Sequence, residues 1–360
     1  MSHPPSQAAP VHNVLFTIPR TASHLLTKIL NLPSQPSILC PANGKDGYLF
    51  LPALVQRFQR NLTERHIGQW NEVDIKRFQE ALQAGFDAWI AFIGHAEGDG
   101  RGTYVKEHIN WLLDPVSEAR ALGYAGQNDV EAFEVYWSDA SKEQERNVHN
   151  LTCLPTKFLL ESVKPTFLVR HPALTFPSAL RTSIDIEGLS IALASERTQR
   201  WECTYAWTLS LYRLYTETPD FNRATFVDGI KYPIILDASD LSNETMLKRY
   251  ALAVGLDDDK VRFVWDAAGK EEVGALEKAE QRMKSTILSS KCVERGKLGV
   301  DGIDLRLLER EWMEEFGDVL ADRMGRLVRA SMPAYEELRG MRLQEDQKVS
   351  VVLERSSVFM

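Results

Sequence analysis

The chain has 360 residues, enough for one large α/β domain with insertions or for two modest domains. Its 42 lysines and arginines against 50 aspartates and glutamates give a net charge of −8, whereas a surface that recruits nucleic acid or an anionic membrane carries a basic excess. The composition therefore argues against nucleic acid and membrane as partners, and a hydrophobic fraction of 44% excludes wholesale disorder.

Short apolar runs alternate with helical stretches along the chain. The runs at residues 14–18, 103–106, 166–169 and 233–237 predict four strands. Apolar strands separated by helices are typical of a parallel sheet that is covered on both faces. We therefore predict the α/β class: a three-layer fold with a central, mostly parallel sheet flanked by helices, with helical insertions and a helical C-terminal region.

The C-terminal third carries a nearly continuous amphipathic pattern over residues 305–338, which predicts a long helix interrupted at Pro333. No repeat, low-complexity tract or long linker divides the chain. We expect a flexible N-terminus over residues 1–12, one α/β domain over residues 13–341 and a C-terminal tail over residues 342–360.

The four cysteines lie far apart and form no CxxC pair, so neither a zinc knuckle nor a dense disulfide framework is predicted. The first ten residues lack the basic and apolar regions of a secretory signal, and no apolar run reaches the roughly 18 residues that a spanning helix needs. We expect a cytoplasmic protein.

The segment after the first predicted strand, from Thr17 to Ser23, has the composition of a phosphate-binding loop. Thr21, Ala22 and Ser23 are small enough for backbone N–H groups to approach a phosphate. The following helix adds the partial positive charge of its N-terminus, and Arg20 adds a full charge. No Walker A motif occurs anywhere in the chain. A capped helix start with a solvent-facing arginine is the alternative.

Arg170 directly follows the third predicted strand, and Ser178 comes eight residues later across a short helical turn. A guanidinium and a hydroxyl that converge from a strand end and a helix suit a dianionic phosphate. Taken alone, the two residues favour a different arrangement, in which Arg170 pairs with a carboxylate and Ser178 bonds to its own helix backbone.

Together these two segments resemble those of the sulfotransferases, and the divergent fungal and bacterial members above all. In that family a T-x-P-K-S-G-T loop holds the 5′-phosphosulfate of the donor, 3′-phosphoadenosine-5′-phosphosulfate, and an arginine and a serine at this spacing hold its 3′-phosphate. The matching residues here are Arg20, Thr21, Ala22 and Ser23 in the loop, and Arg170 with Ser178 for the 3′-phosphate.

Lys106 and His108 stand two residues apart at the end of the second predicted strand, where alternate side chains point to one face. The pattern is similar to the K-T-H of cytosolic sulfotransferases, in which the histidine is the catalytic base and the lysine touches the transferring group. The resemblance thus implies catalytic roles for His108, Lys106 and Arg20. A surface lysine beside a structural histidine is the alternative.

The resemblance implies transfer of a sulfuryl group to the hydroxyl of a small, largely apolar acceptor, without a metal, and release of 3′,5′-adenosine bisphosphate. A secondary metabolite fits this description, and sulfation can activate its hydroxyl for elimination or cyclisation. The alternatives are a P-loop-like nucleotide kinase or hydrolase and a catalytically inactive nucleotide-binding protein. The sequence leaves the oligomeric state open.

The chain departs from the family pattern at three places. Ala22 replaces the loop glycine, which restricts how closely the backbone wraps a phosphate, and Leu25 replaces the tryptophan that stacks on adenine. The usual C-terminal R-K-G-x-x-G-D-W-K loop is absent, and residues 295–297 are predicted to be a solvated basic loop.

Six aromatic residues could line an acceptor pocket, but aromatic residues at helical spacing are more often part of the core, and we predict core positions for them. They are Trp89, Phe92, Trp111, Trp201, Trp207 and Tyr212.

Overall fold

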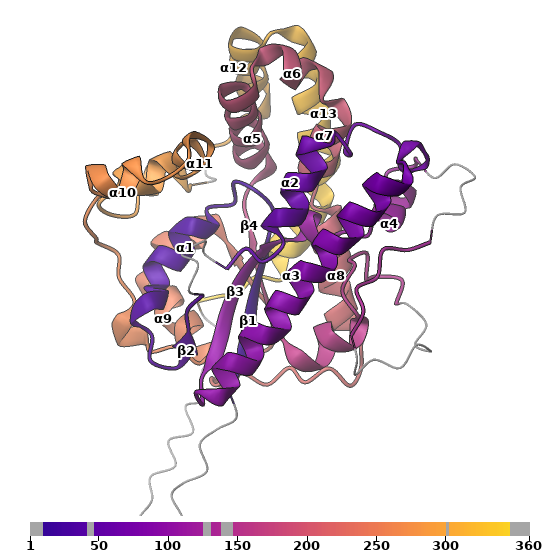
Figure 1. Ribbon diagram of the computed structural model, residues 1–360. Coiled ribbons are helices and arrows are strands. Elements are labelled where there is room, and N and C mark those ends of the chain that lie inside the picture. Colours follow the sequence, from indigo (N-terminus) through magenta and orange to yellow (C-terminus); the bar gives the residue numbers. More distant parts are fainter. Residues whose placement is uncertain (1–9, 42–46, 125–130, 138–146, 300–301, 346–360) are drawn as a thin grey trace, which may run out of the picture.

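A computed structural model describes residues 10–41, 47–124, 131–137, 147–299 and 302–345. A five-stranded, all-parallel sheet with the strand order β2-β3-β1-β4-β5 forms its centre (Figure 1). The strands are β1 (His12–Thr17), β2 (Ile38–Leu39), β3 (Gly102–His108), β4 (Lys164–Val169) and β5 (Ile234–Asp237). All four predicted strands are present, and the short edge strand β2 is an addition.

The central strand β1 has no solvent-exposed position. Every residue from His12 to Thr17 is buried, as expected for a strand that is covered on both faces of a parallel sheet. Its register sets Thr17 opposite His108 of β3 and Phe16 opposite Phe167 of β4. The carboxyl ends of the three central strands therefore lie side by side.

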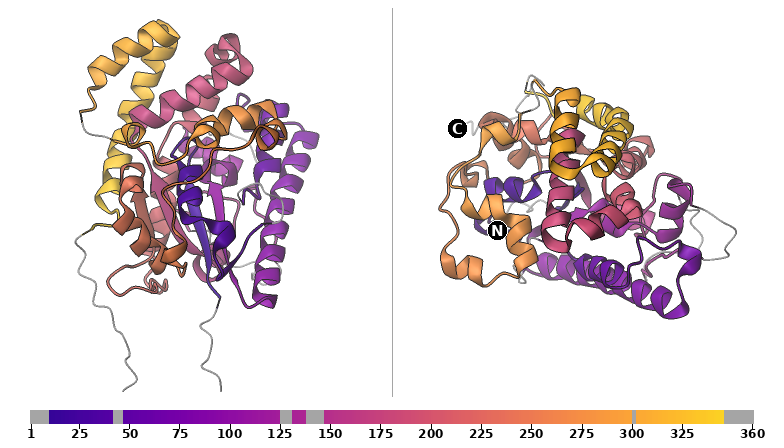
Figure 2. Two further views of the ribbon diagram at one scale, coloured as in Figure 1. Left: turned by 90° about the vertical axis from the view of Figure 1, so that its left-hand side faces the viewer. Right: turned by 90° about the horizontal axis from the view of Figure 1, so that it is seen from above.

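Helices cover both faces of the sheet, with α3 on one face and α9 on the other (Figure 2). The three-layer α/β prediction is confirmed. Above the carboxyl ends of the strands stand α5, α6 and α12 (Figure 1). The helices are α1 (Ser23–Leu30), α2 (Leu51–Gln59), α3 (Glu72–Gly98), α4 (Pro115–Ala121), α5 (Pro172–Glu187), α6 (Leu189–Ala194), α7 (Glu196–Glu202), α8 (Ala206–Glu217), α9 (Glu244–Ala253), α10 (Lys270–Gly274), α11 (Lys278–Ser289), α12 (Leu305–Phe316) and α13 (Asp318–Gly340).

The amphipathic C-terminal pattern forms two helices, and the prediction that it breaks at Pro333 is wrong. The break falls at Gly317, whose φ of 78° lies in the left-handed region that glycine adopts without a steric cost. Helix α13 continues through Pro333 because Tyr335 and Leu338 beyond it are buried and keep the chain against the core. Burial of that face offsets the hydrogen bond that the proline removes.

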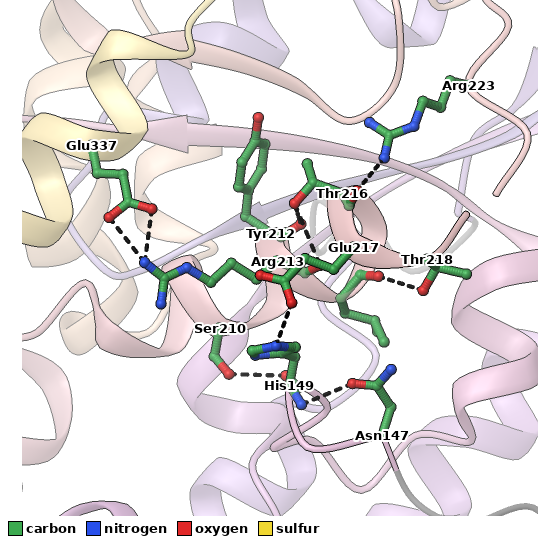
Figure 3. Close-up of polar contacts among 11 residues, drawn as sticks. Asn147, His149, Ser210, Tyr212, Arg213, Thr216, Glu217, Thr218, Arg223 and Glu337 are labelled. Atoms are coloured by element: carbon green, nitrogen blue, oxygen red, sulfur yellow. Dashed lines mark hydrogen bonds and ion pairs between the residues drawn. The ribbon is translucent and has the colours of Figure 1, made fainter. Parts of the chain in front are cut away.

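Polar contacts fasten α8 to its surroundings (Figure 3). Arg213 pairs with Glu337 of α13 across 2.8 Å, and Glu217 pairs with His149 Nε2 across the same distance. The Ser210 hydroxyl donates to the main-chain oxygen of His149. These contacts join α8 both to the C-terminal helix and to the segment that precedes β4.

Both boundaries of the predicted α/β domain lie near the described ends of the chain. Strand β1 begins at His12, and the N–H of Leu343 donates to the carbonyl of Ile235 in β5 across 2.9 Å. The division into residues 1–12, 13–341 and 342–360 stays a prediction. Among the described residues, none of the helices combines the length and the apolar character needed to span a bilayer.

Candidate functional site

The predicted site residues gather at the carboxyl edge of the sheet. Open parallel sheets bind ligands just beyond the carboxyl ends of their strands. Arg20 lies in the loop after β1, and Arg170 directly follows β4. Lys106 and His108 lie at the C-terminal end of strand β3. The in-register pairing of β1 with β3 and β4 brings the three segments together.

The loop after β1 folds as a backbone nest. Arg20 and Ala22 both have left-handed φ values, of 69° and 68°, and Thr21 between them is buried with its hydroxyl donating to the carbonyl of Ile18. Within the described part of the chain, the N–H groups of residues 21–23 donate to no acceptor. Successive N–H groups in such a loop at a helix N-terminus form an anion-binding concavity.

Ala22 lies in the left-handed region that glycine adopts most easily. A non-glycine residue in the left-handed region costs of the order of 1 kcal/mol or more, because its Cβ approaches the backbone. Ala22 is therefore strained in this loop, and the expectation that it restricts how closely the backbone wraps a phosphate stays a prediction.

Two arginines connect the loops after β1 and β4. Arg20 Nε donates to the Ser178 hydroxyl across 3.1 Å and its Nη1 donates to the carbonyl of Met283 in α11 across 2.7 Å. Arg170 Nη1 donates to the carbonyl of Arg20 across 3.0 Å, and its Nη2 donates to the carbonyl of Lys297 across 2.8 Å. The three side chains predicted to bind the two phosphates form one cluster.

Acidic groups balance the charges of these arginines only in part, since the negative charge of Asp237 acts on Arg170 without forming an ion pair with it. Among the described residues, no carboxylate lies within ion-pair distance of Arg20 or Arg170, and the buried Nε of Arg170 has no hydrogen-bond partner. Burial, followed by the positive charges of Arg282 and Arg170, lowers the pKa of Arg20 to about 10. Burial also lowers the pKa of Arg170. A partly buried pair of guanidinium groups without an ion-paired acid is suited to an anion.

His108 is held at both ring nitrogens. Its Nδ1 lies 2.6 Å from the Thr17 hydroxyl, and its Nε2 lies 2.9 Å from the hydroxyl of Tyr48. Burial holds the pKa of His108 well below its usual 6.5, and the positive charges of Lys106, His24 and Arg20 lower it further. The imidazole is therefore neutral near pH 7, the form in which it can accept a proton.

Lys106 projects to the same face of β3 as His108. The lysine is fully buried, its Nζ lies 3.0 Å from His24 Nδ1, and the same atom lies 4.5 Å from the centre of the Tyr48 ring. Tyr48 thus contacts both Lys106 and His108, as two side chains of one strand face require. The buried amino group of Lys106 adds positive charge to the edge where the arginines lie.

Two curated proteins are similar to this chain over nearly its whole length. Sulfotransferase ppzF of Metarhizium rileyi (strain RCEF 4871) is 33% identical over 336 residues, covering 92% of this chain and 96% of the relative. Sulfotransferase ppzF of Metarhizium majus (strain ARSEF 297) is 33% identical over 341 residues, covering 94% and 98%. The chain belongs to the sulfotransferase family. No protein-family profile and no solved structure matches it.

The family prediction from the two anion-binding segments is confirmed, while the roles of the single residues in this sulfotransferase stay predictions. The predicted solvated loop at residues 295–297 has exposed side chains, but its Lys297 carbonyl accepts from Arg170. Among the described residues, no group of three or more His, Cys, Asp and Glu side chains is placed to hold a metal ion.

Sequence reasoning missed three residues of the candidate site: Thr17, His24 and Tyr48. Thr17 and His24 flank the anion-binding loop, so a closer inspection of that loop would have found them. Tyr48 carries no pattern signal. Of the six aromatic residues proposed as core or pocket, four are buried core: Trp89, Trp111, Trp201 and Trp207. Trp111 packs edge-to-face against His108, with ring centres 4.5 Å apart.

A separate cavity of about 220 Å³ lies at the other end of the sheet from the site. Tyr212, Arg223 and Tyr232 line it together with the first residues of β5. None of the predicted catalytic or donor-binding residues contributes to its wall.

Glu107 alternates with Lys106 and His108 and points to the opposite face of β3. Its Oε1 accepts from the N–H groups of Leu49 and Phe50, and among the described residues its buried Oε2 has no hydrogen-bond partner. Burial raises the pKa of Glu107 from 4.5 to about 8, against the lowering effect of these two N–H groups. The carboxyl group is therefore mostly protonated near pH 7.

Glu107→Gln is expected to flatten the dependence of stability on pH. A carboxyl group with a raised pKa stabilises the fold fully below pH 4.5 and loses that contribution as the pH rises through about 8. Glutamine keeps an oxygen for Leu49 and Phe50 but does not ionise. Denaturant unfolding of both proteins between pH 5 and pH 9 measures the effect, with Glu161→Gln on an exposed position as the control. If the wild-type protein and Glu107→Gln lost the same free energy of unfolding between pH 5 and pH 9, the burial argument would be contradicted.

Proposed function

We propose that this sulfotransferase moves a sulfuryl group from 3′-phosphoadenosine-5′-phosphosulfate to the hydroxyl of a small, largely apolar acceptor and releases 3′,5′-adenosine bisphosphate. One observation carries the proposal: Arg20 and Arg170 lie partly buried in one cluster with Ser178, beside a loop of unbonded N–H groups and, among the described residues, with no carboxylate at ion-pair distance. A donor with phosphate groups at both ends matches this amount of positive charge.

The chemistry follows from the charges that the chain supplies. Sulfuryl transfer resembles phosphoryl transfer, whose loose, in-line transition state moves negative charge onto the leaving phosphate. We assign Arg20 and Lys106 to stabilise that charge, which is usually the largest catalytic contribution. Arg170, Ser178 and the loop residues Thr21, Ala22 and Ser23 hold the donor in place. Neutral His108 takes the proton of the acceptor hydroxyl.

The four cysteines are free, which is the state expected in a reducing compartment, and we propose that the enzyme works in the cytoplasm. A secondary metabolite is a suitable acceptor, and its sulfate can leave in a later elimination or cyclisation. Trp111 and Tyr48, which pack against each other with ring centres 4.9 Å apart next to His108, provide an apolar contact for such an acceptor.

A thermal unfolding experiment with two ligands tests the donor assignment. We expect 3′,5′-adenosine bisphosphate at 100 times its dissociation constant to stabilise the protein by about 2.7 kcal/mol. ATP with magnesium is expected to have little effect, because the chain has no Walker A lysine. Stabilisation by ATP–magnesium alone would instead support a nucleotide kinase or hydrolase. Stabilisation by neither nucleotide would remove the donor assignment.

Transfer itself is measured with radiolabelled donor and a panel of phenols and aliphatic alcohols. Labelled product from at least one acceptor is expected. Binding of the bisphosphate without transfer to any acceptor would favour the inactive nucleotide-binding protein.

A further inference from the structure

Tyr48 covers the Nε2 side of the His108 ring. Its hydroxyl lies 2.9 Å from Nε2, and its ring lies against Lys106 on one side and Trp111 on another. His108 is only 6% exposed. With Nδ1 bonded to Thr17, Nε2 is the ring nitrogen left to accept a proton, and it is hydrogen-bonded to a phenol.

The hydrogen bonds around His108 fix the direction in which its protons point. The Thr17 hydroxyl donates to the main-chain carbonyl of Glu107 across 3.4 Å, so its oxygen is available to accept from His108 Nδ1–H across 2.6 Å. A neutral imidazole with its proton on Nδ1 carries a lone pair on Nε2. In this tautomer the Tyr48 hydroxyl, 2.9 Å from Nε2, is the donor to that lone pair.

The backbone on both sides of Tyr48 is fastened to β3. Gly47 packs so closely that a Cβ in its place would lie 3.2 Å from the backbone nitrogen of Lys106, and its φ of 87° suits glycine alone. On the other side, the N–H groups of Leu49 and Phe50 donate to the Glu107 carboxyl group. A side chain that is anchored in this way is a fixed part of the base.

We propose that Tyr48 is a further catalytic residue, whose phenol relays the proton of the acceptor hydroxyl to Nε2 of His108. This inference rests on the proposed function. As the acceptor oxygen forms its bond to sulfur, the bond from sulfur to the oxygen of the 5′-phosphate breaks. The acceptor proton passes to the phenol oxygen, and the original phenol proton passes to Nε2. The phosphate leaves with the electron pair of the broken bond.

The relay predicts a specific defect in Tyr48→Phe, which keeps the ring and removes the hydroxyl. With radiolabelled donor and any acceptor from the panel that the wild-type enzyme sulfates, we expect kcat to fall about 100-fold or more. The KM for the acceptor and the thermal shift with 3′,5′-adenosine bisphosphate are expected to stay unchanged. Tyr136→Phe, which removes a phenol that is 68% exposed, is the matched control and is expected to be fully active.

A proton inventory gives a readout that a merely structural role would not move. In mixtures of H₂O and D₂O, two protons in flight give the wild-type enzyme a bowed dependence of kcat on deuterium fraction, and Tyr48→Phe is expected to give a straight line. If the phenylalanine variant fails to fold, 3-fluorotyrosine at position 48 replaces it. Fluorine makes the phenol more acidic, so the relay predicts a changed kcat, and an unchanged kcat overturns it.

The outcomes separate this inference from the proposed function. A Tyr48→Phe enzyme that is as fast as wild type, or faster, shows that the phenol only blocks Nε2, and this overturns the relay while leaving sulfuryl transfer intact. A wild-type enzyme that sulfates no acceptor in the panel overturns the proposed function, and the relay falls with it.

Discussion

Replacement of His108 by alanine is expected to lower kcat by a factor of about 10²–10⁴, because a positioned proton acceptor contributes an amount of this size. The affinity for 3′,5′-adenosine bisphosphate is expected to change little, since His108 contacts Thr17 and Tyr48 and makes no contact with Arg20, Arg170 or Ser178. Steady-state kinetics and isothermal titration of the same variant measure the two effects separately.

The pH dependence of the wild-type enzyme adds a second check on His108. Because burial and three neighbouring basic groups lower the pKa of His108 well below 6.5, the base stays neutral as the pH falls to 6.5. The acid limb of kcat/KM is therefore expected below pH 6.5. His95→Ala, at an exposed position in the last turn of α3, is the matched control. A His108→Ala enzyme with wild-type turnover would show that another group takes the proton.

Arg170→Ala is expected to weaken binding of 3′,5′-adenosine bisphosphate strongly while kcat at saturating donor is largely retained. Truncating one partner of a buried, hydrogen-bonded charge pair costs about 2–5 kcal/mol, or roughly 30- to 4000-fold in the dissociation constant. The contacts of Arg170 are to the Arg20 and Lys297 carbonyls, away from Lys106 and His108, so the loss falls on binding.

Two further arginine variants sharpen this result. Arg170→Lys keeps the charge but not the planar fork, and we expect an affinity between those of wild type and Arg170→Ala. Arg181→Ala removes another arginine, one in α5 that pairs with Glu315 at the surface, and it is expected to bind like wild type. Equal affinities for the Arg170→Ala and Arg181→Ala enzymes would mean that the guanidinium of Arg170 has only a structural role.

The parts of the site that sequence predicts are those set by local order along the chain. Arg20 and Arg170 each follow a strand directly, and a parallel sheet brings such positions to one edge whatever the details of packing. Lys106 and His108 share a strand face because side chains alternate. None of these four placements depends on how distant helices pack.

The contacts that sequence could not supply join distant segments. Tyr48 meets His108 across 60 residues, and Arg20 meets Ser178 across 158. Such contacts depend on how the loops pack against the folded sheet, and no local sequence pattern predicts that packing. The break at Gly317 was missed for a related reason: burial of the α13 face overrides the local effect of Pro333.

The C-terminal segment approaches the two arginines through main-chain oxygens, those of Met283 and Lys297. Every amino acid carries the same carbonyl, so these contacts place no demand on the side chains at either position. The side chains at positions 283 and 297 can therefore vary as long as the backbone keeps its course. A region without the family's consensus can in this way still pack against the two arginines.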